Sequence, residues 1–177
     1  MRIIAGKYRG KKLKEFNLNT TKPTLDRVKE SIFNLIQFDV AGAKVLDLFS
    51  GTGALGIEAV SRGANKTYFV DSNKQAIKII KENLQGIYGT YEVHEKDAFE
   101  FLKTTNEKFD IVLLDPPFNT DLGTSAIDQI IKNEKLNENG IIIFETAEEK
   151  TFDISYANYN VDKRKYGTVA VYKITKE

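Results

Sequence analysis

The 177-residue sequence contains no cysteine, no tryptophan, one histidine and three prolines. Without cysteine the chain cannot have a disulfide framework, a thiolate nucleophile or a cysteine-ligated zinc site. The longest apolar runs are the length of a strand, and the amino terminus is basic and lacks the apolar stretch of a signal peptide. We therefore expect a cytoplasmic protein with no membrane segment and no bound metal. The lone histidine, His94, at the end of a strand, is assigned no role.

Charge is unevenly distributed, although the formal net charge is only +1. Residues 1–14, which we call the basic arm, carry a charge of +6, and the remainder of the chain therefore carries −5. The cations of the arm are Arg2, Lys7, Arg9, Lys11, Lys12 and Lys14. A basic arm on a mildly acidic body is typical of phosphate binding. On charge alone, a solvated tail explains the pattern equally well.

The length fits one domain, residues 1–177. A helix is expected from Thr24, and strands alternate with helices after Gly42. The expected strands are Lys44–Phe49, Thr67–Val70, Tyr91–His94, Phe109–Leu114, Gly140–Glu145, Phe152–Val161 and Thr168–Ile174. The expected helices are Ala54–Arg62, Lys74–Leu84, Ala98–Lys103 and Thr124–Lys132. This order predicts an α/β fold with a doubly wound, mostly parallel sheet that ends in an antiparallel C-terminal hairpin. Within the domain, we expect residues 1–40 to form an N-terminal basic extension plus helix, and residues 41–177 to form the catalytic core. It resembles the Rossmann-like class I methyltransferase architecture.

Glycines cluster between the first strand and its helix, where they let the backbone approach a ligand closely. Gly51, Gly53 and Gly56 spell G-x-G-x-x-G, and Asp71 follows Gly51 by 20 residues, so the loop also fits an NAD-dependent enzyme. Asp47 favours a ligand with an ammonium group, as in S-adenosyl-L-methionine, and little chain remains for a substrate domain. We therefore expect S-adenosyl-L-methionine to contact Asp47, Ser50, Gly51 and Gly53.

Two more acids follow the next two strands of the predicted sheet. Asp71 is placed to accept both ribose hydroxyls, or to share a helix cap with its neighbours Ser72 and Asn73. Asp97 is placed to meet an adenine amino group, or to form a capping box with Glu100. Because the carboxyl ends of parallel strands form the ligand-binding edge of the sheet, we include Asp71, Asp97, Ala98 and Asp115 in the cofactor site.

The sequence Asp115-Pro116-Pro117-Phe118 follows the most apolar strand. The prolines fix an extended backbone and remove N–H donors, so the loop offers acceptors. The Asp115 carboxylate and the Pro116 carbonyl can each accept one N–H of an exocyclic amine, which orients its nitrogen and stabilises developing positive charge. Phe118 can stack on a base. The loop therefore predicts methylation of a nucleobase amine, against the alternative of an ordinary Asx-type turn.

The chain also resembles the RsmD-type family, which methylates the guanine N2 amine of small-subunit (16S) rRNA. The resemblance rests on residues 2–10, 22–30, 47–63 and 115–118, with Lys165-Tyr166-Gly167 near the end. It spans nearly the whole chain, and the N-terminal motifs discriminate this family from other amino-methyltransferases. The sequence departs from the family pattern at Lys22, usually Arg, and at Phe118, commonly Tyr.

This resemblance implies transfer of one methyl group to guanine N2 in small-subunit rRNA or an assembling 30S particle. It also implies roles for Thr24 and Arg27 near the cofactor or the RNA backbone, and we expect the basic arm to hold phosphates. The Asp115 loop does not itself separate guanine N2 from adenine N6 in RNA or DNA. A non-catalytic RNA-binding factor is a further alternative, disfavoured by the intact loop. We expect a monomer.

Overall fold

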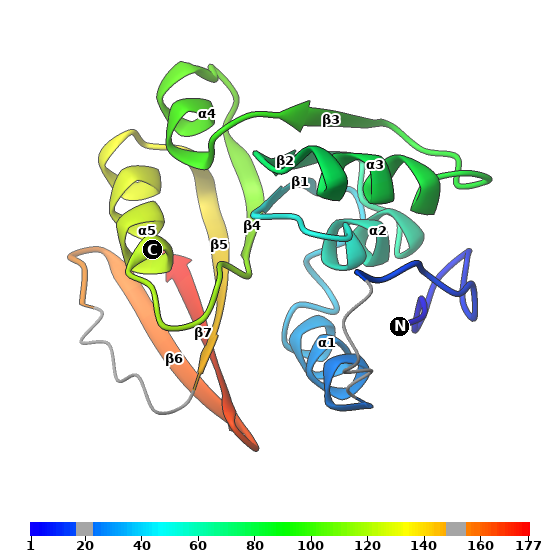
Figure 1. The fold of residues 1–177 in the computed structure, drawn as a ribbon. Coiled ribbons are helices and arrows are strands. Elements are labelled where there is room, and N and C mark those ends of the chain that lie inside the picture. The colour runs from blue at the N-terminus through cyan, green and yellow to red at the C-terminus, as the bar shows by residue number, and fades with distance from the viewer. Residues whose placement is uncertain (17–22, 148–154) are drawn as a thin grey trace.

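A computed structural model describes residues 1–16, 23–147 and 155–177, with only the backbone described at residues 23–25. Its strands form one seven-stranded sheet in the order β3-β2-β1-β4-β5-β7-β6 (Figure 1). The strands are β1 (Lys44–Leu48), β2 (Lys66–Asp71), β3 (Tyr91–Glu95), β4 (Phe109–Leu114), β5 (Leu136–Ala147), β6 (Tyr159–Tyr166) and β7 (Val169–Lys176). Strands β1 to β5 pair in parallel, whereas β7 pairs antiparallel with both β5 and β6.

Helices cover both faces of the sheet, as a doubly wound fold requires (Figure 1). They are α1 (Pro23–Leu35), α2 (Ala54–Ser61), α3 (Lys74–Asn83), α4 (Ala98–Thr104) and α5 (Leu122–Lys132). Helices α4 and α5 pack with Leu46, Val112 and Phe144 on one face. Helices α1, α2 and α3 bury their apolar sides on the opposite face, against residues such as Val45 and Phe69. The predicted fold class is therefore confirmed.

The strand order reverses between β1 and β4, because β1 pairs with both β2 and β4. Connections on the two sides of such a switch point diverge, which leaves a crevice outside the carboxyl ends of the two strands. The glycine loop follows β1, and the Asp115 loop follows β4. The topology therefore brings the two predicted functional loops to one crevice.

The element bounds differ most from the prediction near the carboxyl terminus. The expected strand Phe152–Val161 has the wrong bounds: its first three residues lie outside the described residues, residues 155–158 are not in a strand, and β6 runs from Tyr159 to Tyr166. The charged stretch of β6 has exposed side chains because β6 is the edge strand of the sheet, paired with β7 alone. The prediction left this charged stretch between its last two strands, but an edge strand tolerates such a sequence. The turn lies at Gly167, whose φ is +63°.

The basic arm is folded onto the domain. Ile3 and Leu13 are buried in the cluster formed with α2 and α3, and Arg2 forms an isolated antiparallel bridge with Lys12. Gly6 lies so close to α2 that a Cβ atom there would be 1.9 Å from the carbonyl oxygen of Ser61. The interpretation of the arm as a solvated tail is therefore wrong, since hydrophobic burial and close backbone packing hold it in place. Within the described ranges, no helix is long and apolar enough to span a membrane.

Candidate active site

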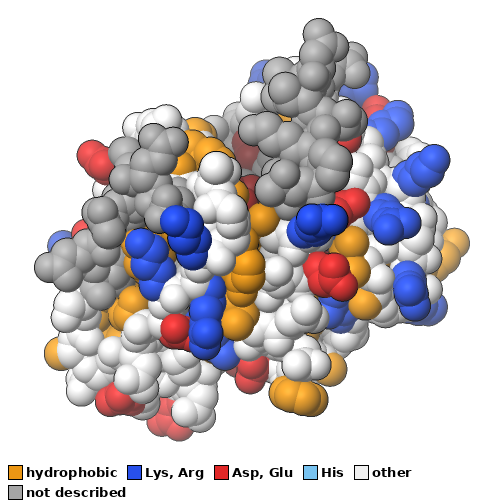
Figure 2. All heavy atoms as spheres, turned by 90° about the horizontal axis from the view of Figure 1, so that it is seen from below, with side chains coloured by type: hydrophobic (Ala, Val, Ile, Leu, Met, Phe, Trp, Pro, Cys, Tyr) orange, Lys and Arg blue, Asp and Glu red, His pale blue; other side chains and the backbone are white. Residues whose placement is uncertain are grey.

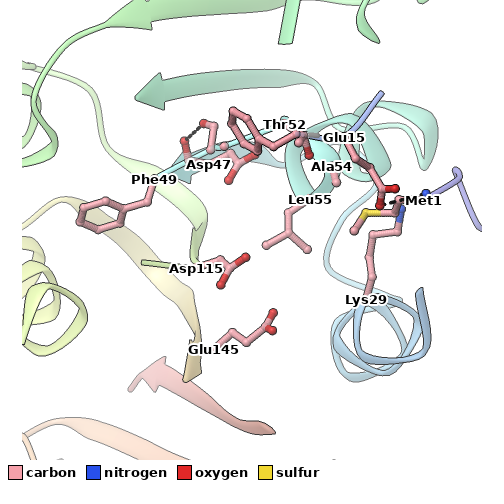
Figure 3. Close-up of a pocket in the computed structure, with 13 residues that line it drawn as sticks. Met1, Glu15, Lys29, Asp47, Phe49, Thr52, Ala54, Leu55, Asp115 and Glu145 are labelled. Carbon is pink, nitrogen blue, oxygen red and sulfur yellow. Dashed lines mark hydrogen bonds and ion pairs between the residues drawn. The ribbon is translucent and has the colours of Figure 1, made fainter. Parts of the chain in front are cut away.

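Two adjoining cavities occupy the crevice at the carboxyl edge of the sheet. The inner cavity has a volume of about 350 Å³ and is lined by residues that include Lys29, Asp47, Asp115 and Glu145 (Figure 3). The outer cavity has a volume of about 720 Å³ and is lined by residues of the β2, β3 and β4 ends. Phe16, Phe49, Gly51 and Asp115 line both cavities. Asp115 thus stands where an elongated ligand in one cavity would meet a molecule in the other.

The glycine loop turns sharply at this junction. Phe49 has a φ of +61°, which strains a residue with a side chain, and Gly53 has a φ of +79° at the start of α2. Gly56 permits close packing, because a Cβ atom there would lie 2.4 Å from the ring of Phe69 and 2.9 Å from Oδ2 of Asp47. The sequence pattern therefore serves the turn and the approach of α2 to the sheet.

Asp47 is almost fully buried, and its Oδ2 accepts a 2.9 Å hydrogen bond from the Gly56 N–H. Burial raises the pKa of Asp47 well above its usual value, and the nearby charges of Asp115 and Asp71 raise it further. Among the described residues, no cation forms an ion pair with it. A ligand that carries an ammonium group would supply the missing positive charge. A dinucleotide pyrophosphate would place negative charge beside the same carboxyl.

Ser50 and Asp71 tie the glycine loop to β2. The Ser50 hydroxyl donates to the carbonyl of Asp47 at 2.6 Å and accepts from the Val70 N–H at 2.9 Å. Its side chain therefore fixes the loop. Asp71 accepts the Gly51 N–H through Oδ2 at 2.9 Å and the Asn73 N–H through Oδ1 at 2.8 Å. Each Asp71 oxygen keeps a free lone pair beside the outer cavity, and Asn73 serves as the N-cap of α3.

Asp97 caps a helix and also borders the outer cavity. It is the N-cap of α4, and its Oδ1 accepts the N–H groups of Phe99 and Glu100 at 2.9 and 3.0 Å. Asp97 and Ala98 also line the outer cavity. The cap fixes the carboxyl, so the Oδ2 atom is held as an acceptor at the cavity. Asp71 and Asp97 together give the outer cavity acceptors suited to hydroxyl and amino groups of a nucleoside.

The Asp115 loop lines the outer cavity, and Asp115 itself also lines the inner one. Pro116 is buried, and among the described residues none donates to its carbonyl, whereas the Pro117 carbonyl accepts the Thr120 hydroxyl at 2.7 Å. Phe118 is 44% exposed, which leaves its ring available for stacking. The Asp115 side chain is open to the cavity. The surrounding protein nevertheless desolvates the carboxyl group, which raises its pKa to about 6. Asp115 and Pro116 therefore present two free acceptors from adjacent residues.

Glu145 belongs to the site, although no sequence motif marked it. It follows Phe144, which pairs with Leu114 in the β4–β5 register, so Glu145 is the cross-strand neighbour of Asp115. It lines the inner cavity and is only 6% exposed. Burial, and then the charge of Asp115, raise the pKa of Glu145 well above its usual value. An apolar strand that ends in Glu was the only available signal, and it was read simply as the end of the strand.

The sequence analysis assigned no role to Lys29 or Glu58, although both lie in segments that carry the family resemblance. Lys29 of α1 lines the inner cavity, donates to the Arg2 carbonyl at 2.6 Å and lies 3.4 Å from Oε2 of Glu58. Burial lowers the pKa of Lys29, an effect that the nearby Glu58 carboxylate opposes. These two buried side chains join α1, α2 and the basic arm beside the cavity. No local pattern indicated either residue, because their partners are distant in the sequence.

The basic arm residues divide into two groups. Lys11 donates to the carbonyl of Gln85, and Lys14 forms a 2.7 Å ion pair with Glu82, so both cations contact α3 or the loop after it. Arg2, Lys7, Arg9 and Lys12 are exposed, as is Arg27 on α1. Lys22 lies outside the described residues, and the side chain of Thr24 is not described. The face drawn in Figure 2 shows Lys and Arg side chains in two groups with hydrophobic side chains between them.

The chain is similar to several known methyltransferases in sequence and in fold. A family model described as "Conserved hypothetical protein 95" matches residues 1–175. The chain is 37% identical to "Ribosomal RNA small subunit methyltransferase D" of Haemophilus influenzae, over 98% of this chain and 92% of that protein. A solved structure, "Putative methyltransferase yhhF" from Escherichia coli, superposes with a TM-score of 0.90 at 30% identity, covering 100% of this chain and 98% of that one. A more distant structure, "SMU.776, a putative methyltransferase complexed with SAH", shares the fold with a TM-score of 0.66 at 22% identity, covering 84% of this chain and 48% of that one.

Proposed function

Because this chain belongs to the family described as Conserved hypothetical protein 95, the RsmD-type family, we propose that it methylates the N2 amine of a guanine in small-subunit (16S) rRNA. The methyl donor is S-adenosyl-L-methionine. The observation that carries the proposed chemistry is the pair of free acceptors at Asp115 and Pro116, at the junction of the two cavities. The ribosomal substrate is supported by the name of the Haemophilus influenzae relative, and guanine by the sequence resemblance.

The described side chains fit the methyl donor. Asp71 and Asp97 place acceptors at the outer cavity for the ribose hydroxyls and the adenine amine, and Asp47 places a buried carboxyl where an ammonium group would pair with it. When bound, S-adenosyl-L-methionine supplies an electrophilic methyl group and leaves as S-adenosylhomocysteine after transfer. Gly51 and Gly53 allow the chain to pass close to such a ligand.

Asp115 and Pro116 act on the amine. A guanine N2 is a poor nucleophile because its lone pair is delocalised into the ring. The Asp115 carboxylate and the Pro116 carbonyl each accept one of its N–H bonds, which holds the nitrogen in one orientation and offsets the positive charge that develops there. As the nitrogen bonds to the methyl carbon, the proton that it must lose passes to Asp115 or to water. Phe118 stacks on the base, which is presented from a loop or flipped from its stack.

One experiment tests this function directly. The protein is incubated with labelled S-adenosyl-L-methionine and with undermethylated small subunits, naked small-subunit RNA, DNA or a protein extract. We expect label only in small-subunit RNA, recovered as N2-methylguanosine after nuclease digestion and mass spectrometry. Label in DNA or protein alone would refute the ribosomal substrate, and methyladenine would refute the guanine assignment. Calorimetry with S-adenosylhomocysteine and NAD should detect binding of the former only.

We further propose that the exposed cations of the basic arm hold RNA phosphates while the protein acts as a cytoplasmic monomer. Replacement of Lys7, Arg9 and Lys12 by alanine should weaken RNA binding and reduce the slope of log affinity against log salt by about 1 for each phosphate that the variant no longer binds. Lys11 and Lys14 are left intact because they contact the protein. A matched control replaces the exposed Lys103, Lys108 and Lys132, and fluorescence anisotropy at several salt concentrations provides the measurement. Equal slopes in both variants would exclude the arm from RNA binding.

A further inference from the structure

Glu145 is a buried carboxyl group directed into the inner cavity beside Asp115 (Figure 3). Neighbouring parallel strands lie about 4.8 Å apart, and residues at matching register positions point to the same face of the sheet. The register pairs Leu114 of β4 with Phe144 of β5, so the next residues, Asp115 and Glu145, stand side by side on the face covered by α1. The cavity therefore presents two adjacent carboxyl groups from two rigid strand ends.

Glu145 has no partner for this carboxyl within the part of the chain that the structure describes. The residue is only 6% exposed, yet no hydrogen bond or ion pair to its side chain is present among these residues. An unpaired buried carboxyl is unfavourable for folding, and native structures seldom retain one without a use. Its neighbours do not explain it as a metal ligand, because no group of three potential ligands converges within the described residues. Lys29, the buried cation nearest in the cavity lining, is held by Glu58 and the Arg2 carbonyl.

We propose that Glu145 is a specificity-determining residue that accepts the N1–H of the target guanine while Asp115 accepts an N–H of its N2 amine. This inference rests on the proposed function. Guanine carries N1–H and the N2 amine as adjacent donors on its Watson–Crick edge, whereas adenine carries an unprotonated N1 beside its N6 amine. Two carboxyl groups side by side match the guanine edge. When adenine occupies the site, an ionised Glu145 has no N1–H to accept and faces the lone pair of N1 instead.

Glu145 shares the inner cavity with Asp47, but it lies on another strand and away from the other carboxylates proposed for the cofactor. Asp71 and Asp97 line the outer cavity, and Glu145 lines only the inner one. Asp47 is two strands away from Glu145, since β1 pairs with β4 and β4 pairs with β5. Glu145 therefore faces the Asp115 carboxyl from the side of β5, where the base edge would lie if Asp115 and Pro116 hold its amine.

A double-mutant cycle between protein and base tests the contact. Small-subunit RNA is assembled by ligation with either guanine or 2,6-diaminopurine at the methylated position, once mass spectrometry has mapped it. Diaminopurine keeps the N2 amine but has no N1–H. In the wild-type protein and in Glu145→Met, kcat/KM is measured on both RNAs. Glu138→Met, on the exposed opposite end of the same strand, is the matched control.

We expect Glu145→Met to lower kcat/KM about tenfold or more on the guanine RNA and less than about threefold on the diaminopurine RNA, as for the loss of one hydrogen bond to a base edge. Glu145→Gln should retain part of the guanine rate, because its amide oxygen still accepts N1–H. Affinity for S-adenosylhomocysteine, measured by calorimetry, should stay within about twofold. Replacement of a buried unpaired carboxyl by Met should not lower the melting temperature.

Three results would overturn the proposal. Equal slowing on both RNAs would show that Glu145 supports the structure without contacting N1. A loss of S-adenosylhomocysteine affinity that parallels the loss of rate would make Glu145 a cofactor ligand. A wild-type rate in Glu145→Met would remove it from the site. These results differ from a failure of the proposed function, in which the wild-type protein itself would yield no N2-methylguanosine.

Discussion

Replacement of Asp115 by alanine is expected to slow methyl transfer by about 10²–10³-fold, a typical loss when one preorganised electrostatic group is removed from an active site. The variant loses the acceptor that orients the amine and the charge that stabilises the developing cation. Asp115 contributes no strand pairing, and its side chain is open to the cavity, so the fold should be unaffected. Single-turnover kinetics with saturating RNA and S-adenosyl-L-methionine measure the chemical step.

Asp115→Asn should fall between wild type and Asp115→Ala, because the amide oxygen still accepts one N–H but carries no full charge. The rates of the wild-type protein and of Asp115→Asn should also depend differently on pH. The pKa of Asp115 is raised to about 6, so the wild-type rate should fall as the pH drops below that value and the carboxylate is protonated. The carboxyl groups that face Asp115 in the cavity, Asp47 and Glu145, also have raised pKa values. The part of the fall in rate at low pH that disappears in Asp115→Asn is therefore the part due to protonation of Asp115.

Cofactor binding provides the control for this prediction. Calorimetry should show that both variants bind S-adenosylhomocysteine within about threefold of wild type, whereas Asp47→Asn, which removes the charge for the ammonium group, should bind it more weakly. Unchanged turnover in Asp115→Ala would refute the mechanism. Equal losses of cofactor affinity and rate would instead place Asp115 in the cofactor site alone.

The parts of the site that could be predicted from the sequence are those encoded by short segments at strand ends. Asp47, Asp71 and Asp97 each follow a strand, and parallel pairing brings strand ends to one edge whatever the remaining contacts. The Asp115 loop is encoded by four consecutive residues with restricted backbones. Hydrophobic periodicity assigned the alternating strands and helices for the same local reason.

The parts that could not be predicted depend on contacts between distant residues. The location of Glu145 in the site follows only from the β4–β5 register, which places it beside Asp115. Strand β6 has few apolar residues to reveal it, because its stability comes from pairing with β7 rather than from burial. The order of the basic arm likewise depends on Glu58, more than 50 residues away from the backbone groups that it accepts.

Replacement of Glu58 by alanine is expected to destabilise the fold strongly. The fully buried carboxylate accepts the Ile4 and Ala5 N–H groups at 2.9 and 3.0 Å, and the Arg62 Nε–H at 2.8 Å. It also lies 3.4 Å from the ammonium of Lys29, which is itself 2% exposed. Alanine would leave two backbone donors and a buried cation without their acceptor.

Removing one partner of a buried ion pair costs about 3–5 kcal/mol, and in a domain of this size each kcal/mol lowers the melting temperature by about 2–4 °C. Calorimetric melting of Glu58→Ala should therefore show a fall of roughly 6–20 °C. Because Ile4 and Ala5 are held by Glu58, the arm should detach first, and limited trypsin digestion should cleave after Lys7, Arg9 or Lys12 much faster than in wild type.

Glu82→Ala is the matched control, since Glu82 of α3 is a partly exposed partner of Lys14 on the arm, and solvent screens this ion pair. We expect little change in its melting temperature or digestion pattern. If Glu58→Ala melts like wild type with its arm protected, the apolar contacts of Ile3 and Leu13 suffice to hold the arm. If Glu58→Ala melts at a lower temperature, kcat/KM for RNA should fall as the arm becomes sensitive to trypsin. The reason is that Lys29 and Met1, the first residue of the arm, line the inner cavity.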